Sequence, residues 1–179
     1  MSGNSPSVLH IATHGFFFKK PKEQPRQNEL LEQKNAYKVH QNPLLRSGLL
    51  FANANYAWQN GNNPYEKDDG ILTALEISNL DLKNTDIVIL SACETGLGDI
   101  EGSEGVYGLQ RAFKMAGVKT IIMSLWPVPD AETAEFMNLF YTKWKKFNNP
   151  KKAFKETQKI MMNKYRDEPE KWAAFVYFE

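Results

Sequence analysis

Ile87-Val-Ile-Leu-Ser-Ala-Cys93-Glu-Thr-Gly96 predicts a buried strand that leads straight into a reactive side chain. A second run, Val8-Leu-His-Ile-Ala-Thr-His14-Gly15, has the same form. Continuous aliphatic residues are typical of strands buried on both faces, as in a parallel sheet. In such a sheet, ligands bind just beyond the carboxyl ends of the strands. If the two strands are neighbours, His14 and Cys93 therefore emerge side by side at that edge.

The rest of the chain alternates between short apolar runs and helical patterns. We predict strands over Val8 to Thr13, Gly48 to Phe51, Asp86 to Ser91, Lys119 to Leu125 and Ala174 to Phe178. We predict helices from a capping box at Thr73 to Asn79, from Gly105 to Ala116, from an N-cap at Asp130, and from Asn149-Pro150. This alternation predicts one α/β domain over residues 1–179, with a parallel or mixed sheet flanked by helices.

Two polar stretches, residues 19–46 and 53–70, interrupt this rhythm. Both are rich in Asn or Gln and contain proline, and connections of this length in a compact domain are usually functional or disordered. We therefore expect two long, mobile loops.

Composition and charge exclude several classes of protein. The net charge of the 179 residues is only +1, which disfavours broad binding to nucleic acid or to an anionic membrane. The basic segment Lys19 to Lys38 also lacks the interleaved aromatic residues that stack on bases. No apolar run approaches the ~20 residues needed to cross a bilayer. Residues 1–7 do not form a secretory signal, and a single cysteine fits a reducing compartment, so we expect a cytoplasmic protein.

The two strand-end residues suggest a Cys-His dyad. A thiol becomes a strong nucleophile when a nearby imidazole accepts its proton, and the backbone N–H groups of Gly15 and Cys93 are candidate donors to the oxyanion. The residues alone leave other interpretations open. A lone cysteine at a strand end is commonly a small buried apolar residue, and a lone histidine is commonly a hydrogen-bonded structural group. A metal site formed by His10, His14 and Cys93 is disfavoured because the paired spacing of zinc ligands is missing.

Six motifs extend the pattern over nearly the whole chain. They are Ala12-Thr-His-Gly15, Leu90-Ser-Ala-Cys-Glu-Thr-Gly96, Gly102-Ser-Glu-Gly105, Ser124-Leu-Trp126 with Val128-Pro-Asp130, Phe140-Tyr141, and Trp172-Ala-Ala-Phe175. In this order they resemble the CHAT domain, a cysteine-peptidase module related to caspases and separase and often found beside tetratricopeptide repeats. The resemblance implies a caspase-like three-layer α/β/α sandwich with a mostly parallel sheet. It also implies a dyad of His14 and Cys93 that cleaves protein substrates without a metal or organic cofactor.

The chain departs from the family pattern at its start. Family members usually carry further strands and helices before the Ala12-Thr-His-Gly15 strand, so the chain resembles the C-terminal, catalytic portion of a CHAT domain that lacks its N-terminal elements. We expect this to leave a strand edge or an apolar face exposed. The expected partners are a protein or peptide substrate and either a tetratricopeptide-repeat segment or the missing N-terminal part.

The resemblance also suggests substrate-binding residues. In separase, a motif similar to Leu125-Trp126-Pro-Val-Pro-Asp130 supplies the acid that binds the basic residue before the scissile bond, which makes Asp130 a candidate selector for Arg or Lys. An aspartate before a long helix is equally suited to capping that helix. Trp126 is expected in the pocket or in the core. Glu94, beside the nucleophile, either contacts substrate or belongs to a local hydrogen-bond network.

The sequence therefore predicts a cysteine endopeptidase that cleaves a protein substrate after a basic residue, in a bacterial-type signalling or defence pathway. The alternative is a catalytically silent or latent CHAT-fold scaffold that docks partner proteins.

Overall fold

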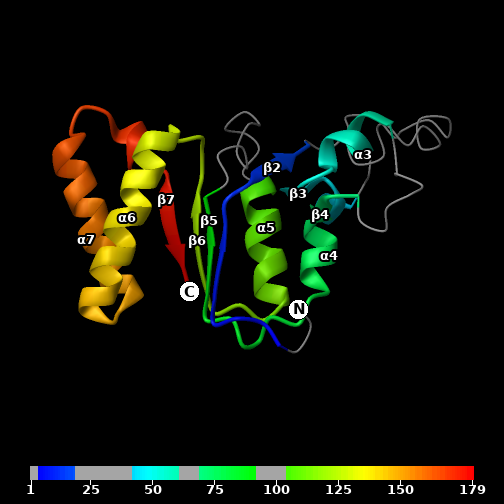
Figure 1. Cartoon of the computed structure of the whole chain (residues 1–179), viewed down its shortest axis with the longest axis horizontal. Coiled ribbons are helices and arrows are strands. Elements are labelled where there is room, and N and C mark those ends of the chain that lie inside the picture. Colours follow the sequence, from blue (N-terminus) through cyan, green and yellow to red (C-terminus); the bar gives the residue numbers. More distant parts are fainter. Residues whose placement is uncertain (1–3, 19–41, 61–68, 92–103) are drawn as a thin grey trace.

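A four-stranded sheet forms the centre of the computed structural model, which describes residues 4–18, 42–60, 69–91 and 104–179 (Figure 1). Its strands are β1 (Val8–Ile11), β5 (Ile87–Leu90), β6 (Thr120–Ser124) and β7 (Phe175–Phe178), in the order β1-β5-β6-β7. The first three are parallel, whereas β7 runs antiparallel to β6. The sheet is therefore mostly parallel, as predicted.

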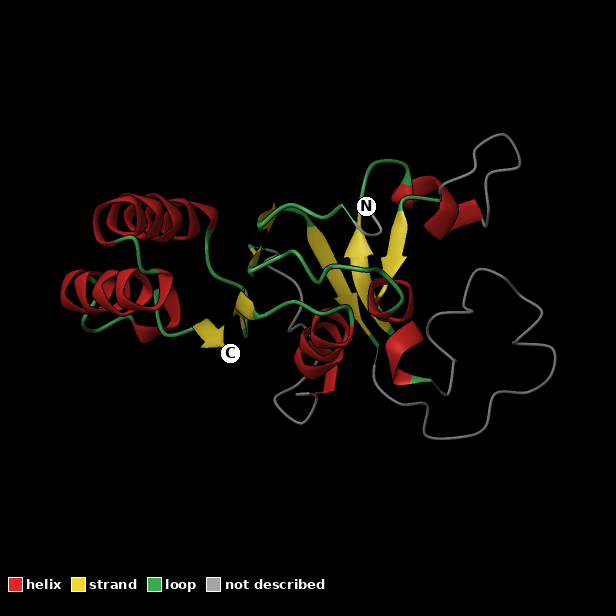
Figure 2. Cartoon of the chain, turned by 90° about the horizontal axis from the view of Figure 1, so that it is seen from below, coloured by secondary structure: helices red, strands yellow, loops and turns green. Residues whose placement is uncertain are grey.

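Helices cover both faces of this sheet. Figure 1 views the sheet from its edge, with α4 (Ala74–Ser78) and α5 (Glu104–Met115) on one side and α6 (Asp130–Phe147) and α7 (Pro150–Lys164) on the other. The same separation of helices is visible in Figure 2. This arrangement confirms the predicted α/β architecture, in which a mostly parallel sheet is enclosed by helices as in caspase-like folds.

Alternation along the central strands divides the core into two clusters. Val88 and Leu90 of β5 face the cluster formed with α4 and α5, whereas Ile87 and Ile89 face the cluster formed with α6 and α7. All four side chains are at most 2% exposed. A strand buried on both faces needs apolar residues at every position, which explains the uninterrupted Ile87-Val-Ile-Leu90 run.

A second, antiparallel sheet lies beyond the carboxyl end of β1. It consists of β2 (His14–Phe17), β3 (Ser47–Leu50) and β4 (Ile71–Thr73), in the order β2-β3-β4. The sequence predicted β3 but neither β2 nor β4. The predicted strand over 8–13 instead ends at Ile11, and the chain bends before entering β2 at His14. Strands this short depend on pairing with a distant partner, here β3, which local sequence does not reveal.

The predicted loop over 53–70 is wrong in one part, because it contains helix α3 (Ala54–Asn60). Ala54 and Ala57 are buried against Phe16 and Ile71 of the small sheet, so tertiary packing stabilises a helix in an asparagine-rich stretch. Two short 3-10 helices, η2 (Pro43–Leu45) and η3 (Pro169–Lys171), complete the described elements. Residues 19–41 and 61–68 of the predicted loops lie outside the described residues.

Helix starts follow the predicted capping signals with one exception. Thr73 and Glu76 form the predicted capping box, and the Asn149 side chain accepts a hydrogen bond from the Lys152 N–H at 2.9 Å. The prediction that Asp130 caps α6 is wrong. The extended residue Pro129 occupies the cap without a side-chain bond, and Asp130 is the first residue of the helix. Its carboxylate still lies at the positive end of the helix dipole.

None of the helices in the described part of the chain is both long enough and apolar enough to span a bilayer.

Candidate active site

The carboxyl ends of β1 and β5 meet at one edge of the central sheet. The two strands pair in parallel, with Ile11 opposite Leu90, so the condition on which the predicted dyad depends is met. β6 pairs in parallel with β5, and its carboxyl end lies at the same edge. Figure 1 shows β2 and the first turn of α6 at this end of the molecule. Parallel sheets bind ligands at such an edge.

His14 is the first residue of β2 and lies opposite Leu50 of β3. Its side chain is exposed, and the hydroxyl of the preceding Thr13 donates to the Leu50 carbonyl oxygen. This bond anchors the bend between the two sheets, where the chain leaves β1. The imidazole is thus carried by a short strand that pairs with β3 and begins directly after this anchored bend.

Gly15 turns its backbone N–H away from β3. Phe18 N–H donates to the Arg46 carbonyl oxygen at 2.7 Å, and in an antiparallel pair such bonds recur at every second residue. The N–H groups of residues 14, 16 and 18 therefore face β3, and that of Gly15, a buried residue, points to the other side of β2, where no strand of the described residues pairs with it. β2 is the outer strand of that sheet, so an anion beside His14 could accept a hydrogen bond from Gly15.

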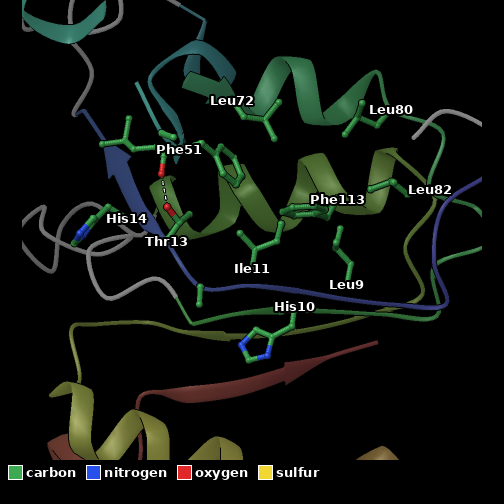
Figure 3. A pocket seen from close by; sticks show the side chains of 13 residues that line it. Leu9, His10, Ile11, Thr13, His14, Phe51, Leu72, Leu80, Leu82 and Phe113 are labelled. Carbon is green, nitrogen blue, oxygen red and sulfur yellow. Dashed lines mark hydrogen bonds between the residues drawn. The ribbon is translucent and has the colours of Figure 1, made fainter. Parts of the chain in front are cut away.

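A cavity of about 610 Å³ lies between β1, the small sheet and α5, with His14 and Thr13 at one end (Figure 3). Its walls are mainly apolar, with Leu9, Ile11 and Phe113 among the lining side chains. This cavity is on the face of the central sheet that α4 and α5 cover. It offers space for an apolar side chain beside Thr13 and His14, and none of the described residues that line it is a carboxylate that could bind a basic one.

Trp126 and Asp130 lie in and just after the connection from β6 to α6. The Trp126 ring packs against the core cluster on the α6 face, and its Nε1–H donates to the Glu170 carbonyl oxygen at 3.0 Å. Asp130 is exposed at the start of α6. Both residues are at the same edge of the sheet as His14, but neither lines the cavity beside it.

Cys93 and Glu94 lie outside the described residues, which end at Ser91 and resume at Glu104. The structure therefore describes the histidine of the predicted dyad, Gly15 as a predicted oxyanion donor, and two of the three predicted substrate-binding residues.

The sequence did not predict a pair of hydrogen bonds made by His10 on the opposite face of β1. His10 Nε2 is 3.0 Å from Ser91 Oγ, and its Nδ1 is 2.9 Å from the hydroxyl of Tyr141 in α6. Figure 3 shows His10 on the side of β1 opposite Leu9 and Ile11. Partial burial lowers the pKa of His10 below its ordinary value and raises that of Tyr141. These two hydrogen bonds link α6 to Ser91, which follows β5 and lies two residues before Cys93 in the sequence.

Strand alternation could have placed His10 on this face, but its partner Tyr141 is 131 residues away in the sequence. No local pattern predicts a contact over that separation.

Comparison with known proteins finds one family model and two relatives. The model is described as the CHAT domain and matches residues 1–178. The human protein named "Tetratricopeptide repeat protein 28" is 31% identical over 107 residues, and its mouse counterpart is 30% identical over 107 residues. Each alignment covers 59% of this chain but only 4% of the relative, so the chain corresponds to a small part of those proteins.

Proposed function

The chain belongs to the CHAT domain family of caspase-like peptidases, and on that premise we propose that it is a cysteine endopeptidase with a dyad of Cys93 and His14. The Cys93 thiolate attacks the scissile carbonyl carbon, after its proton passes to His14. His14 then gives this proton to the leaving amine, and water hydrolyses the thioester to release the second product. The backbone N–H groups of Gly15 and Cys93 donate to the oxyanion of each tetrahedral intermediate.

The register of β1 against β5 is the observation that carries this proposal. Ile11 pairs with Leu90, and the same three-residue step along each chain leads to His14 and to Cys93. Two parallel strands thus end side by side, each three residues before one member of the proposed dyad, which supports a dyad at this edge. The outward N–H of Gly15 gives further support, because it is free of the β2–β3 ladder and next in sequence to the proposed base.

We propose that the substrate carries a basic residue before the cleaved bond, with Asp130 as its partner and Trp126 and Glu94 beside it. The exposed start of α6 supports Asp130, since it lies at the same sheet edge as His14. The apolar cavity beside His14 suits a neighbouring apolar substrate residue. The relatives' name supports a context next to tetratricopeptide repeats. We further propose that the substrate is a cytoplasmic protein in a bacterial-type signalling or defence pathway.

The test is cleavage of a peptide library in which arginine or lysine is fixed at one position. Cys93→Ala and His14→Ala should each reduce cleavage by about 10³-fold or more, since the two groups act as a unit. Asp130→Asn should weaken cleavage after basic residues by about tenfold while cleavage after neutral ones changes little. Circular dichroism confirms that each variant is folded. Cleavage that survives Cys93→Ala would refute the assignment.

A silent or latent scaffold is the alternative, and labelling separates it from the enzyme. An electrophilic peptide should modify Cys93 rapidly at neutral pH in the wild-type chain and slowly in His14→Ala, because the imidazole promotes the thiolate. Equal and slow labelling of both proteins would favour the scaffold.

A further inference from the structure

Basic charge is concentrated on the hairpin formed by α6 and α7. Residues 143–159 contain seven of the 22 Lys and Arg residues but only one of the 21 Asp and Glu residues, Glu156. Six of the seven lysines are exposed. Within the described part of the chain, Lys151 is the only one of the seven that forms an ion pair, with Glu179. A chain that is nearly neutral overall therefore carries a hairpin rich in exposed lysines.

A groove of about 390 Å³ lies within this surface, between α7 and β7. One stripe of α7 forms its first wall, with Lys151 and Lys155 at the rim and Phe154, which is 4% exposed, at the base. All four residues of β7 form the second wall. The groove thus combines an apolar base with two cationic side chains on one side.

No strand of the described residues pairs with the outer edge of β7, which runs along this groove. β7 ends the order of the central sheet, and Leu125 N–H donates to the Ala174 carbonyl oxygen at 2.9 Å. Because hydrogen-bonded pairs alternate along an antiparallel ladder, Val176 and Phe178 bond to β6, while Phe175 and Tyr177 direct their N–H and C=O groups outward. Gln158 Nε2 donates to the Phe175 carbonyl oxygen at 2.8 Å, which confirms that this group points toward α7.

We propose that this groove binds an acidic peptide segment that adds as an extended strand to the edge of β7. The backbone groups of Tyr177 would pair with the added strand, as in other complexes formed by strand addition. Side chains of that strand would alternate between the two faces of the sheet. Those on the α7 face meet Lys151 and Lys155, and those on the other face lie beside Val176 and Phe178. The best ligand therefore alternates acidic with apolar residues.

The charge of the rim selects this ligand over a second copy of the chain. Two copies joined through β7 would bring the same lysine-rich hairpins to one edge, where like charges repel. Nucleic acid would satisfy the lysines but could not add backbone hydrogen bonds to β7. The existing pair between Lys151 and Glu179 shows that a carboxylate can be accommodated at this rim.

The test uses a fluorescent peptide of about six residues, a common strand length, that alternates glutamate with valine. Binding is followed by fluorescence anisotropy. The protein carries Cys93→Ala, so that the peptide is not cleaved if the proposed function is right. Lys151→Glu with Lys155→Glu should weaken binding about tenfold, since rim charges govern such encounters. Lys159→Glu, one turn further along α7, and the distant Lys83→Glu carry the same charge change and should have much smaller effects. A peptide that carries lysine in place of glutamate should instead bind the Lys151→Glu, Lys155→Glu variant more tightly than the wild-type groove.

Methylation of the peptide backbone tests strand addition separately from charge. Methyl groups on the set of alternate nitrogens that face β7 should abolish binding, whereas methyl groups on the other set should leave it unchanged. Equal binding of neutral or scrambled peptides, or an absence of any methylation effect, would overturn the proposal. It would also be overturned if an oligonucleotide displaced the peptide at equal charge, or if the chain dimerised and Lys151→Glu strengthened the dimer. Loss of peptidase activity in any variant has no bearing on these outcomes, so the two proposals can fail independently.

Discussion

His10 is a solvent-accessible polar residue of β1 whose contacts connect three elements of the fold. Its ring bonds Ser91 beyond β5 and Tyr141 in α6, and the His10 and Tyr141 rings are 5.8 Å apart. A neutral imidazole can satisfy both hydroxyl groups by donating from one nitrogen and accepting at the other. Partial burial favours this neutral form, which lowers the pKa of His10 below its ordinary value near 6.5. The side chain remains accessible to water, which limits the size of the effect.

We expect His10 to make the free energy of unfolding depend on pH. Because the folded-state pKa is lowered, the stabilising contribution is fully present above pH 6.5 and is lost as the pH falls through the folded value. His10→Gln removes the titrating group, so urea unfolding between pH 5 and pH 8 should show a smaller decline in acid than the wild type. A histidine titration followed by NMR gives the pKa directly. Identical acid dependence in the two proteins would contradict the prediction.

Tight backbone contact between strands holds the small sheet that carries His14. A Cβ atom added to Gly48 of β3 would lie 2.5 Å from the Leu72 carbonyl oxygen of β4 and 2.7 Å from the Phe16 ring of β2. The carbonyl belongs to the paired backbone and cannot turn aside without breaking the β3–β4 ladder. Gly48→Ala should therefore lower the free energy of unfolding by about 1–3 kcal/mol.

Gly108→Ala provides the control for this change. Its new Cβ would lie 2.7 Å from Ser47 Oγ, a small side-chain atom that can rotate away, and alanine gains about 1 kcal/mol of helix propensity over glycine in α5. Denaturant unfolding should show that this variant is close to wild type in stability. If Gly48→Ala were equally stable, the close packing of β2, β3 and β4 would not limit this sheet.

The elements that the sequence predicted are those that form because of residues close together in the chain. The run Ile87-Val-Ile-Leu90 specifies a strand by its own composition, and the capping residues Thr73 and Asn149 begin helices through bonds within a few residues. The pairing of β1 with β5 was only a condition of the predicted dyad, because strand pairing depends on residues far apart in the chain. β2 and β4 were missed for the same reason. In the site, His14 was predicted from its motif, whereas the contacts of His10 could not be, because they join residues distant in the chain.

The whole molecule is organised by one sheet that separates two hydrophobic clusters. Neighbouring residues of β6 belong to different clusters, Ile121 to the one under α4 and α5 and Ile122 to the one under α6 and α7. Both side chains are fully buried. Since the same backbone supports both clusters, loss of either one should remove the sheet on which the other packs. The molecule is therefore expected to unfold as a single cooperative unit.

Ile121→Val and Ile122→Val test this expectation as a matched pair. Each removes one methylene from a fully buried site on the same strand and should cost about 0.5–1.5 kcal/mol. In a Trp58→Phe background, fluorescence reports mainly on the α6 and α7 face, because Trp126, Trp144 and Trp172 all pack against that cluster. Circular dichroism reports on helices of both faces. If unfolding is cooperative, Ile121→Val should shift the fluorescence transition as much as the dichroism transition, although the changed residue faces away from all three tryptophans. A fluorescence midpoint unaffected by Ile121→Val would show instead that the two faces unfold separately.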